Sequence, residues 1–99
     1  MGLRAYFFIN VADDMTQQEF VKELMELERM PEVDFVDPVV GDYDVVVMVE
    51  APVSVEALAN KFKEKPWIKE LRILRIVSLF ERHQASKREL LKALRHSGV

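Results

Sequence analysis

The sequence contains no cysteine, which excludes disulfide bonds, thiolate metal sites and a cysteine nucleophile. It has only two histidines, His83 and His96, and they stand outside the expected core without the spacing of a metal site. Three glycines are too few for a glycine-rich phosphate loop or a nucleophile elbow. We therefore expect no metal ion, no cofactor and no catalytic residues.

The chain also lacks long hydrophobic runs. Nothing approaches the ~18 consecutive apolar residues that a membrane helix needs, and the apolar run at residues 5–9 is too short for a signal peptide. We expect a cytoplasmic protein that does not bind membranes. Its 99 residues, 49% hydrophobic and 31% charged, suit one folded domain.

The net charge of −3 conceals a polarised chain. Residues 1–50 hold three bases against twelve acids, and residues 51–99 hold eleven bases against five acids, so the two halves carry −9 and +6. The C-terminal bases do not alternate with aromatic residues, and a pI near 5.4 is unlike that of a nucleic-acid-binding domain. We expect no direct contact with nucleic acid. In a symmetric assembly, acidic surface of one copy would instead face basic surface of another.

Hydrophobic patterning predicts the element order β-α-β-β-α-β, with strands at residues 3–11, 33–40, 43–50 and 68–80. Thr16 and Glu19 form a capping box that starts the first helix, and Pro31 ends it. Ser54 caps the second helix. Its apolar stripe recurs at i, i+3, i+4 and i+7, with Val55, Leu58, Ala59 and Phe62.

Two β-α-β units joined by a hairpin predict a ferredoxin-like α+β fold, with a four-stranded antiparallel sheet of order 4-1-3-2 and two helices on one face. Pro38 supports this order, because proline within a strand indicates a sheet edge. Gly41-Asp42 suits a two-residue type II′ hairpin turn.

A further capping box, Ser86 with Glu89, predicts a C-terminal helix that carries three leucines, Leu90, Leu91 and Leu94. We therefore divide the chain into a ferredoxin-like domain over residues 1–80 and a helical extension over residues 81–99.

Both faces of the predicted sheet are apolar, although two helices cover only one of them. In the first strand Ala5, Phe7 and Ile9 point one way, and Tyr6 and Phe8 point the other. A bare second face would exceed the apolar patch that soluble monomers tolerate. We expect a second copy to cover it by two-fold symmetry, as a sheet-to-sheet homodimer or a larger homo-oligomer. The alternative is that the C-terminal helix folds back over this face.

Gly41, Asp42, Tyr43 and Asp44 form the candidate ligand-binding site. Asp42 and Asp44 place two carboxylates beside a phenol and a tight turn. The carboxylates would hold the ammonium group of a small zwitterion, while the N–H groups of the turn would take its carboxylate. The structural interpretation also stays open, in which Asp42 suits the turn and Asp44 begins a strand.

The stretch Val40-Gly41-Asp42-Tyr43-Asp44, followed by an aliphatic strand, resembles the Gly-x-Tyr-Asp motif of the Lrp/AsnC family of transcriptional regulators. With the element order, it makes residues 3–79 similar to the effector-binding domain of that family, called RAM for regulation of amino-acid metabolism. Pro66-Trp67-Ile68 resembles the family's Pro-Gly-Val, with Trp67 in place of glycine. Full-length members begin with a helix-turn-helix, whereas the first strand here begins near residue 3, so we expect a stand-alone RAM domain.

The resemblance implies dimers formed through their sheets, higher assemblies, and a small effector, typically an amino acid, bound between subunits beside residues 41–44. It predicts a non-catalytic, ligand-sensing domain linked to the transcriptional regulation of metabolism.

Two alternatives stay open. One is a small dimeric α+β-barrel enzyme, which would need an acid, base or metal ligand within its pocket. The other is a purely structural self-assembly module whose C-terminal helix docks on a neighbouring subunit.

Overall fold

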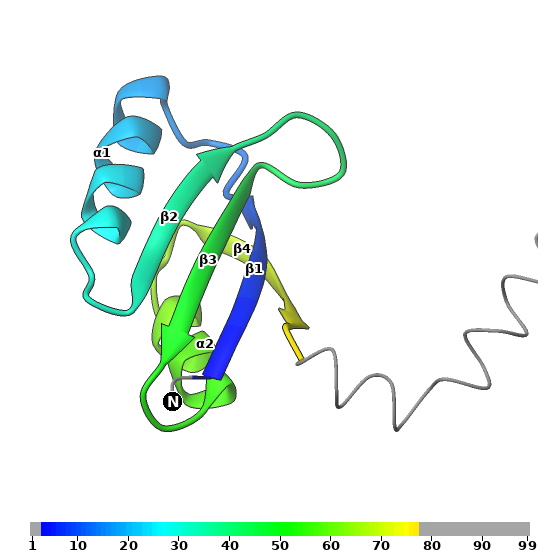
Figure 1. Ribbon diagram of the computed structural model, residues 1–99. Helices are drawn as coiled ribbons and strands as arrows, with labels where there is room; N and C mark the ends of the chain where they lie inside the picture. The colour runs from blue at the N-terminus through cyan, green and yellow to red at the C-terminus, as the bar shows by residue number, and fades with distance from the viewer. Residues whose placement is uncertain (1–2, 78–99) are drawn as a thin grey trace, which may run out of the picture.

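Six elements follow one another in the predicted order in the computed structural model, which describes residues 3–77 (Figure 1). They are β1 (Leu3–Val11), α1 (Gln17–Glu28), β2 (Val33–Pro38), β3 (Val45–Ala51), α2 (Val55–Lys63) and β4 (Ile68–Arg75). All neighbouring strands are antiparallel, and the sheet order is β2-β3-β1-β4. The predicted ferredoxin-like fold and strand order are therefore confirmed, with Pro38 on an edge strand. The predicted C-terminal helix and the extension over residues 81–99 lie outside the described residues.

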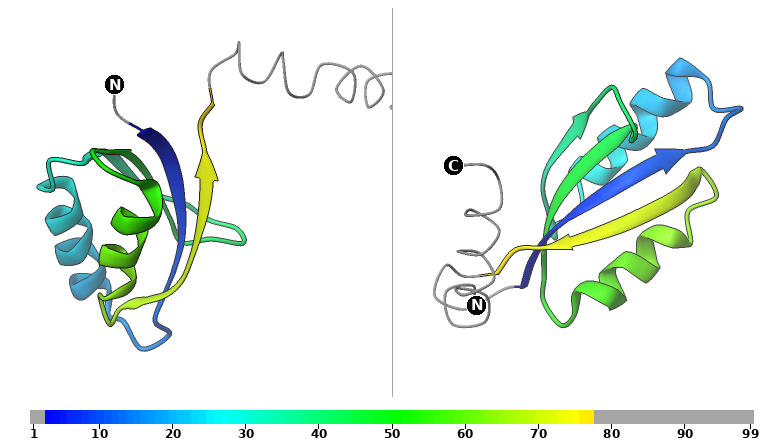
Figure 2. Two further views of the ribbon diagram at one scale, coloured as in Figure 1. Left: turned by 90° about the horizontal axis from the view of Figure 1, so that it is seen from below. Right: turned by 90° about the vertical axis from the view of Figure 1, so that its right-hand side faces the viewer.

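Local side-chain hydrogen bonds start both helices. Glu19 N–H donates to Thr16 Oγ1 (3.1 Å) and Thr16 N–H donates to Glu19 Oε1 (2.9 Å), so the predicted capping box is present. Ser54 Oγ accepts from Ala57 N–H (3.0 Å) at the start of α2. Both helices lie on the same side of the sheet (Figure 2). The predicted stripe of α2 is buried there: Val55, Leu58, Ala59 and Phe62.

The core is built from rows of side chains that the strand register aligns. Across the helix-facing side, Val36 pairs with Val47, Val47 with Phe7, and Phe7 with Ile73. The rings of Phe7 and Phe62 meet edge to face at 5.0 Å and 84°, and both side chains are fully buried. This contact joins the central strand to α2.

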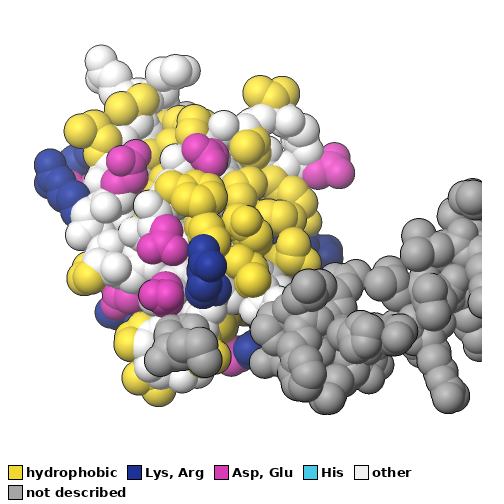
Figure 3. Space-filling model, viewed as in Figure 1, with side chains coloured by type: hydrophobic (Ala, Val, Ile, Leu, Met, Phe, Trp, Pro, Cys, Tyr) yellow, Lys and Arg dark blue, Asp and Glu magenta, His cyan; other side chains and the backbone are white. Residues whose placement is uncertain are grey.

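The opposite side of the sheet, which we call the open face, is also apolar. Its central row runs across all four strands, from Phe35 through Met48 and Tyr6 to Leu74. Phe35 is 40% exposed and Leu74 is 54% exposed. Figure 3 shows hydrophobic side chains gathered over the strands on this side. The prediction of two apolar faces holds for the described strands.

The hairpin between β2 and β3 differs from its predicted conformation. Its register is centred on Gly41-Asp42 as predicted, because Pro38 pairs with Val45. The last hydrogen bond between the two strands of the hairpin joins Val39 N–H to Asp44 O (2.9 Å), and residues 40–43 form a wider loop. Gly41 has φ 144°, far from the about +60° of a type II′ turn. The type II′ prediction was wrong; hydrogen bonds between Asp44 and β1, one donated by Asp44 N–H and one accepted by its carboxylate, hold the base of the wider loop.

Two strands are also shorter than predicted at this loop. β2 ends at Pro38 rather than residue 40, and β3 begins at Val45 rather than residue 43. Within residues 3–77, β4 ends at Arg75, although Ile76 N–H still donates to Arg4 O (3.0 Å). The remainder of the predicted fourth strand, residues 78–80, lies outside the described residues.

The capping box makes part of the stability depend on pH. Hydrogen bonds from the Thr16 backbone N–H and, secondarily, the Thr16 side chain hold the pKa of Glu19 below its ordinary value. The stabilisation is therefore present above the ordinary pKa and is lost as pH falls through the lowered pKa. We expect Glu19→Gln to flatten the acid side of the curve of unfolding free energy against pH, measured by urea denaturation. Glu28→Gln, at an exposed position of α1, is the control, and equal curves for both variants would contradict this role.

Candidate functional site

The predicted ligand residues lie on the loop that joins β2 to β3 (Figure 1). Gly41 and Asp42 are exposed at its tip, and the space around Gly41 is open, so its positive φ rather than crowding favours glycine there. Tyr43 is half-buried, and its ring lies 5.2 Å from the ring of Phe8 at 49°. Tyr43 therefore rests on the edge of the open face.

Asp44 ties the loop to β1 through backbone and side chain. Its N–H donates to Ile9 O (3.0 Å), and its Oδ2 accepts from Val11 N–H (2.9 Å). The regular β1–β3 ladder ends one residue earlier, at the pair Ile9 and Val45. The Asp44 carboxylate thus takes the place of a strand carbonyl and extends the bonding of β1 beyond the ladder.

A polar hollow of about 180 Å³ lies on one side of Asp44. Its lining includes Asn10, Asp13, Lys69 and Glu70. Lys69 Nζ donates to both carboxylate oxygens of Asp13 (3.3 and 3.2 Å). Asn10 Nδ2 lies 3.5 Å from Glu70 Oε2, across the pairing of β1 with β4. The hollow therefore combines one ammonium group with several carboxylates, which suits a ligand that carries both charges.

An apolar hollow of about 300 Å³ also reaches Asp44. It is lined by Val11, Phe20, Pro38, Val39, Val40 and Asp44. Asp44 and Val11 belong to both hollows. A small molecule with a charged end and a hydrocarbon end finds complementary groups on the two sides of one carboxylate.

The loop residues that the sequence analysis singled out separate into two groups. Asp44 lines both hollows, whereas Gly41, Asp42 and Tyr43 line neither. Ligand binding by these four residues stays a prediction. The polar hollow was not predicted, since Asn10, Lys69 and Glu70 come together only through the β1–β4 pairing. One signal was available: Asn10 is a polar residue near the end of an otherwise apolar strand.

The described residues give no indication of a metal centre or a membrane helix. Among residues 3–77, no three acidic or histidine side chains gather closely enough to hold a metal ion. No helix in that range is long and apolar enough to span a bilayer. The layer between sheet and helices is filled by hydrophobic side chains such as Phe7, Leu27 and Phe62.

No protein-family model matches this chain, and no curated protein matches it in sequence. Solved structures do share its fold. FFRP-DM1 is 24% identical with a TM-score of 0.59, over 76% of this chain and 99% of that one. The hypothetical protein PHS023 from Pyrococcus horikoshii is 22% identical with a TM-score of 0.62, over 82% of this chain and 96% of that one.

An AsnC family transcriptional regulator from Agrobacterium tumefaciens is 21% identical with a TM-score of 0.61. The match covers 78% of this chain and 51% of the regulator, so this chain corresponds to about half of that protein. At these identities the likeness concerns the fold. It confirms the RAM-like fold that the resemblance in sequence implied.

The hydrogen bond from Val11 to Asp44 predicts different effects for two substitutions. Asp44→Ala leaves the Val11 N–H without its acceptor, and we expect a loss of about 1–3 kcal/mol of unfolding free energy in urea. Asp44→Asn keeps an oxygen acceptor and should lose less. Amide hydrogen exchange at Val11 should accelerate in the alanine variant only. Equal stability and equal exchange in both variants would contradict the role assigned to the carboxylate.

Proposed function

We propose that the protein is a non-catalytic regulatory domain of the cytoplasm that forms homodimers through the open face and senses an amino acid beside the β2–β3 loop. In this proposal it influences transcription through other proteins and does not contact nucleic acid itself. The observation that carries the proposal is the position of Asp44 between the polar and apolar hollows.

The two hollows match the parts of an amino acid with a hydrocarbon side chain. Lys69 would bind the ligand carboxylate, exchanging its contact with Asp13 for a second anion. The free oxygen of Asp44 and the carboxylate of Glu70 would accept from the ligand ammonium group. Phe20 and Val39 would contact its side chain. Asp42 and Tyr43, on the same loop, would close over the ligand from the exposed side.

The open face supports the dimer. Its central row contains two side chains that are about half exposed, Phe35 and Leu74, beside Tyr6 and Met48. Packing two such faces together removes this apolar area from water. Each Å² of apolar surface buried in this way stabilises the dimer by roughly 25 cal/mol. A two-fold axis brings the same patch of each copy into contact.

Ligand binding and assembly would be coupled through Tyr43. Its ring packs on Phe8, whose side chain belongs to the open face, while its neighbour Asp44 lines both hollows. A ligand that repositions the loop would therefore change the border of the dimer interface. This coupling gives a sensing domain a way to pass the signal to a partner. The fold shared with the Agrobacterium regulator supports a regulatory role.

Amino-acid binding is tested by thermal unfolding with each amino acid in turn. At a ligand concentration of about 100 times Kd, we expect a stabilisation of about 2.7 kcal/mol and a rise in Tm of roughly 10 °C. Lys69→Gln should abolish the rise because it removes the cation of the polar hollow. Lys63→Gln, an exposed lysine of α2, is the matched control and should retain it. No response to any amino acid, or full response of Lys69→Gln, would contradict the proposal.

The dimer is tested by Leu74→Glu, which places a carboxylate in the centre of the proposed interface. Burying an unpaired charge costs several kcal/mol, so we expect the dissociation constant of the dimer to rise by a factor of about a hundred or more. Light scattering over a concentration series should show the mass falling to that of one chain. Val53→Glu, at a valine that is 81% exposed between β3 and α2, should leave the mass unchanged. A dimer that survives Leu74→Glu would exclude the open face as its interface.

A further inference from the structure

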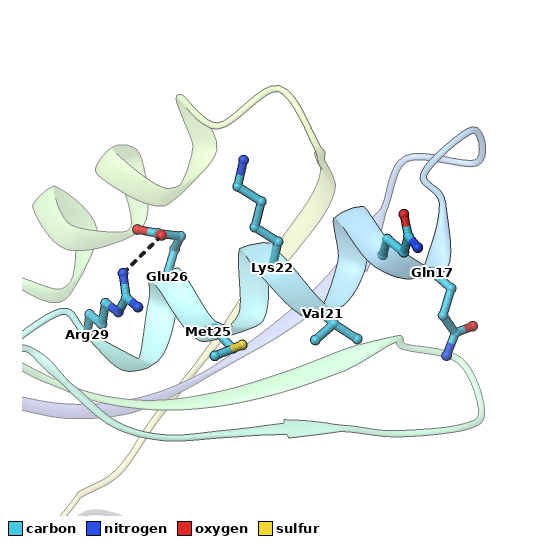
Figure 4. A pocket seen from close by; sticks show the side chains of 7 residues that line it. Gln17, Val21, Lys22, Met25, Glu26 and Arg29 are labelled. Atoms are coloured by element: carbon cyan, nitrogen blue, oxygen red, sulfur yellow. Dashed lines mark hydrogen bonds and ion pairs between the residues drawn. The ribbon is translucent and has the colours of Figure 1, made fainter.

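The outward side of α1 carries a short apolar stripe. Val21 is 48% exposed and Met25, one turn later, is 54% exposed. They lie in a groove of about 440 Å³, with Lys22, Glu26 and Arg29 also in its lining. Figure 4 shows Val21 and Met25 pointing to the same side of the helix, with Lys22 and Glu26 directed away from them. We call this groove, defined by Val21 and Met25, the α1 groove.

The α1 groove lies in the acidic part of the domain. Residues 13–50 carry twelve acids against two bases, a net charge of −10, while residues 51–77 carry three acids against six bases, a net charge of +3. A basic segment is therefore attracted to the surface formed by α1 and β2 and repelled from that formed by α2 and β4. Within the groove, Glu26 is already paired with Arg29 at 3.3 Å and Lys22 leaves a net positive charge, so this attraction comes from the acidic surface around the groove.

The chain itself contains a segment of complementary pattern. Residues 78–99 carry five bases against two acids, a net charge of +3. Leu90 and Leu94 have the same spacing as Val21 and Met25, and the helix that the capping box at Ser86 predicts would align them over one turn. Two apolar stripes of equal length can pack against each other where two helices meet.

We propose that the C-terminal segment 86–96 of one copy docks in the α1 groove of a second copy. Leu90 and Leu94 would cover Val21 and Met25, while the surrounding bases would face the acidic surface of α1 and β2. This proposal concerns a surface distinct from the open face and from the ligand site, so it does not depend on the proposed function.

The length of the connection favours a second copy. Ser86 follows Val77 by nine positions, a reach of at most about 30 Å. α1 packs on β2, at the opposite edge of the sheet from β4. A path within one copy crosses three strand spacings, about 14 Å, and then passes around a helix about 10 Å in diameter. That path uses most of the reach, whereas docking on a second copy imposes no such detour.

The absence of cysteine makes the test direct, because each introduced thiol is unique. Full-length Met25→Cys and full-length Leu94→Cys are mixed and oxidised under mild conditions, and the linked peptides are identified by mass spectrometry. We expect the bond between positions 25 and 94 to form about ten times faster than the bond in a mixture of Val53→Cys with Leu94→Cys, because docking raises the effective concentration of the thiols. Val53 is an exposed valine outside the groove.

A second pair of variants tests the charges. Lys92→Glu with Arg95→Glu in the Leu94→Cys chain should reduce the rate of bonding to position 25 to that of the control. Rates equal to the control in the unaltered pair would overturn the proposal. A single chain that carries both Met25→Cys and Leu94→Cys distinguishes docking within one chain from docking between two copies. A disulfide bond formed only within one chain would overturn the assignment to a second copy. The mass of Leu74→Glu by light scattering tests the open-face dimer independently of this docking.

Discussion

The position of β1 at the centre of the sheet constrains the rest of the molecule. It is hydrogen-bonded to β3 on one edge and to β4 on the other, so neither edge is free, and both its faces carry large apolar side chains. Phe7 on one face requires the helix layer, which it meets at Phe62. Tyr6 and Phe8 lie on the other face and are half-buried. Both faces of the central strand are thus apolar, although the two helices cover only one of them.

The candidate site is a consequence of where β1 ends. Beyond Ile9 the ladder with β3 stops, and the Val11 N–H would lack a partner on that side without the Asp44 carboxylate. The register of β1 against β4 also shifts between Asn10 and Val11. Both irregularities fall beside the two hollows. In the proposed function, the Asp44 carboxylate would therefore serve both structural hydrogen bonding and ligand recognition.

The fold could be predicted from the sequence because its signals are local. Caps at Thr16 and Ser54, the stripe ending at Phe62 and the proline at position 38 each involve residues within one or two turns of one another. The loop conformation could not be predicted, because it depends on hydrogen bonds between Asp44 and β1, more than thirty positions away. The polar hollow has the same origin, since Asn10 and Glu70 meet only across the sheet. Of the four motif residues, Asp44 lines the polar and the apolar hollow and the other three line neither, a difference that depends on the direction of its side chain.

The composition of the two sheet edges has a consequence for aggregation. β2 presents exposed Asp34 and Asp37 and ends at Pro38, which has no N–H to offer an added strand. β4 carries three bases along its length: Lys69, Arg72 and Arg75. Two β2 edges repel one another, and Pro38 removes one N–H from any pairing of β2 with another edge, while Lys69 and Arg75 of β4 are already paired with acids of the same chain. Growth of copies edge to edge into a fibril is thereby disfavoured, even though a domain with this much exposed hydrocarbon would otherwise be prone to it.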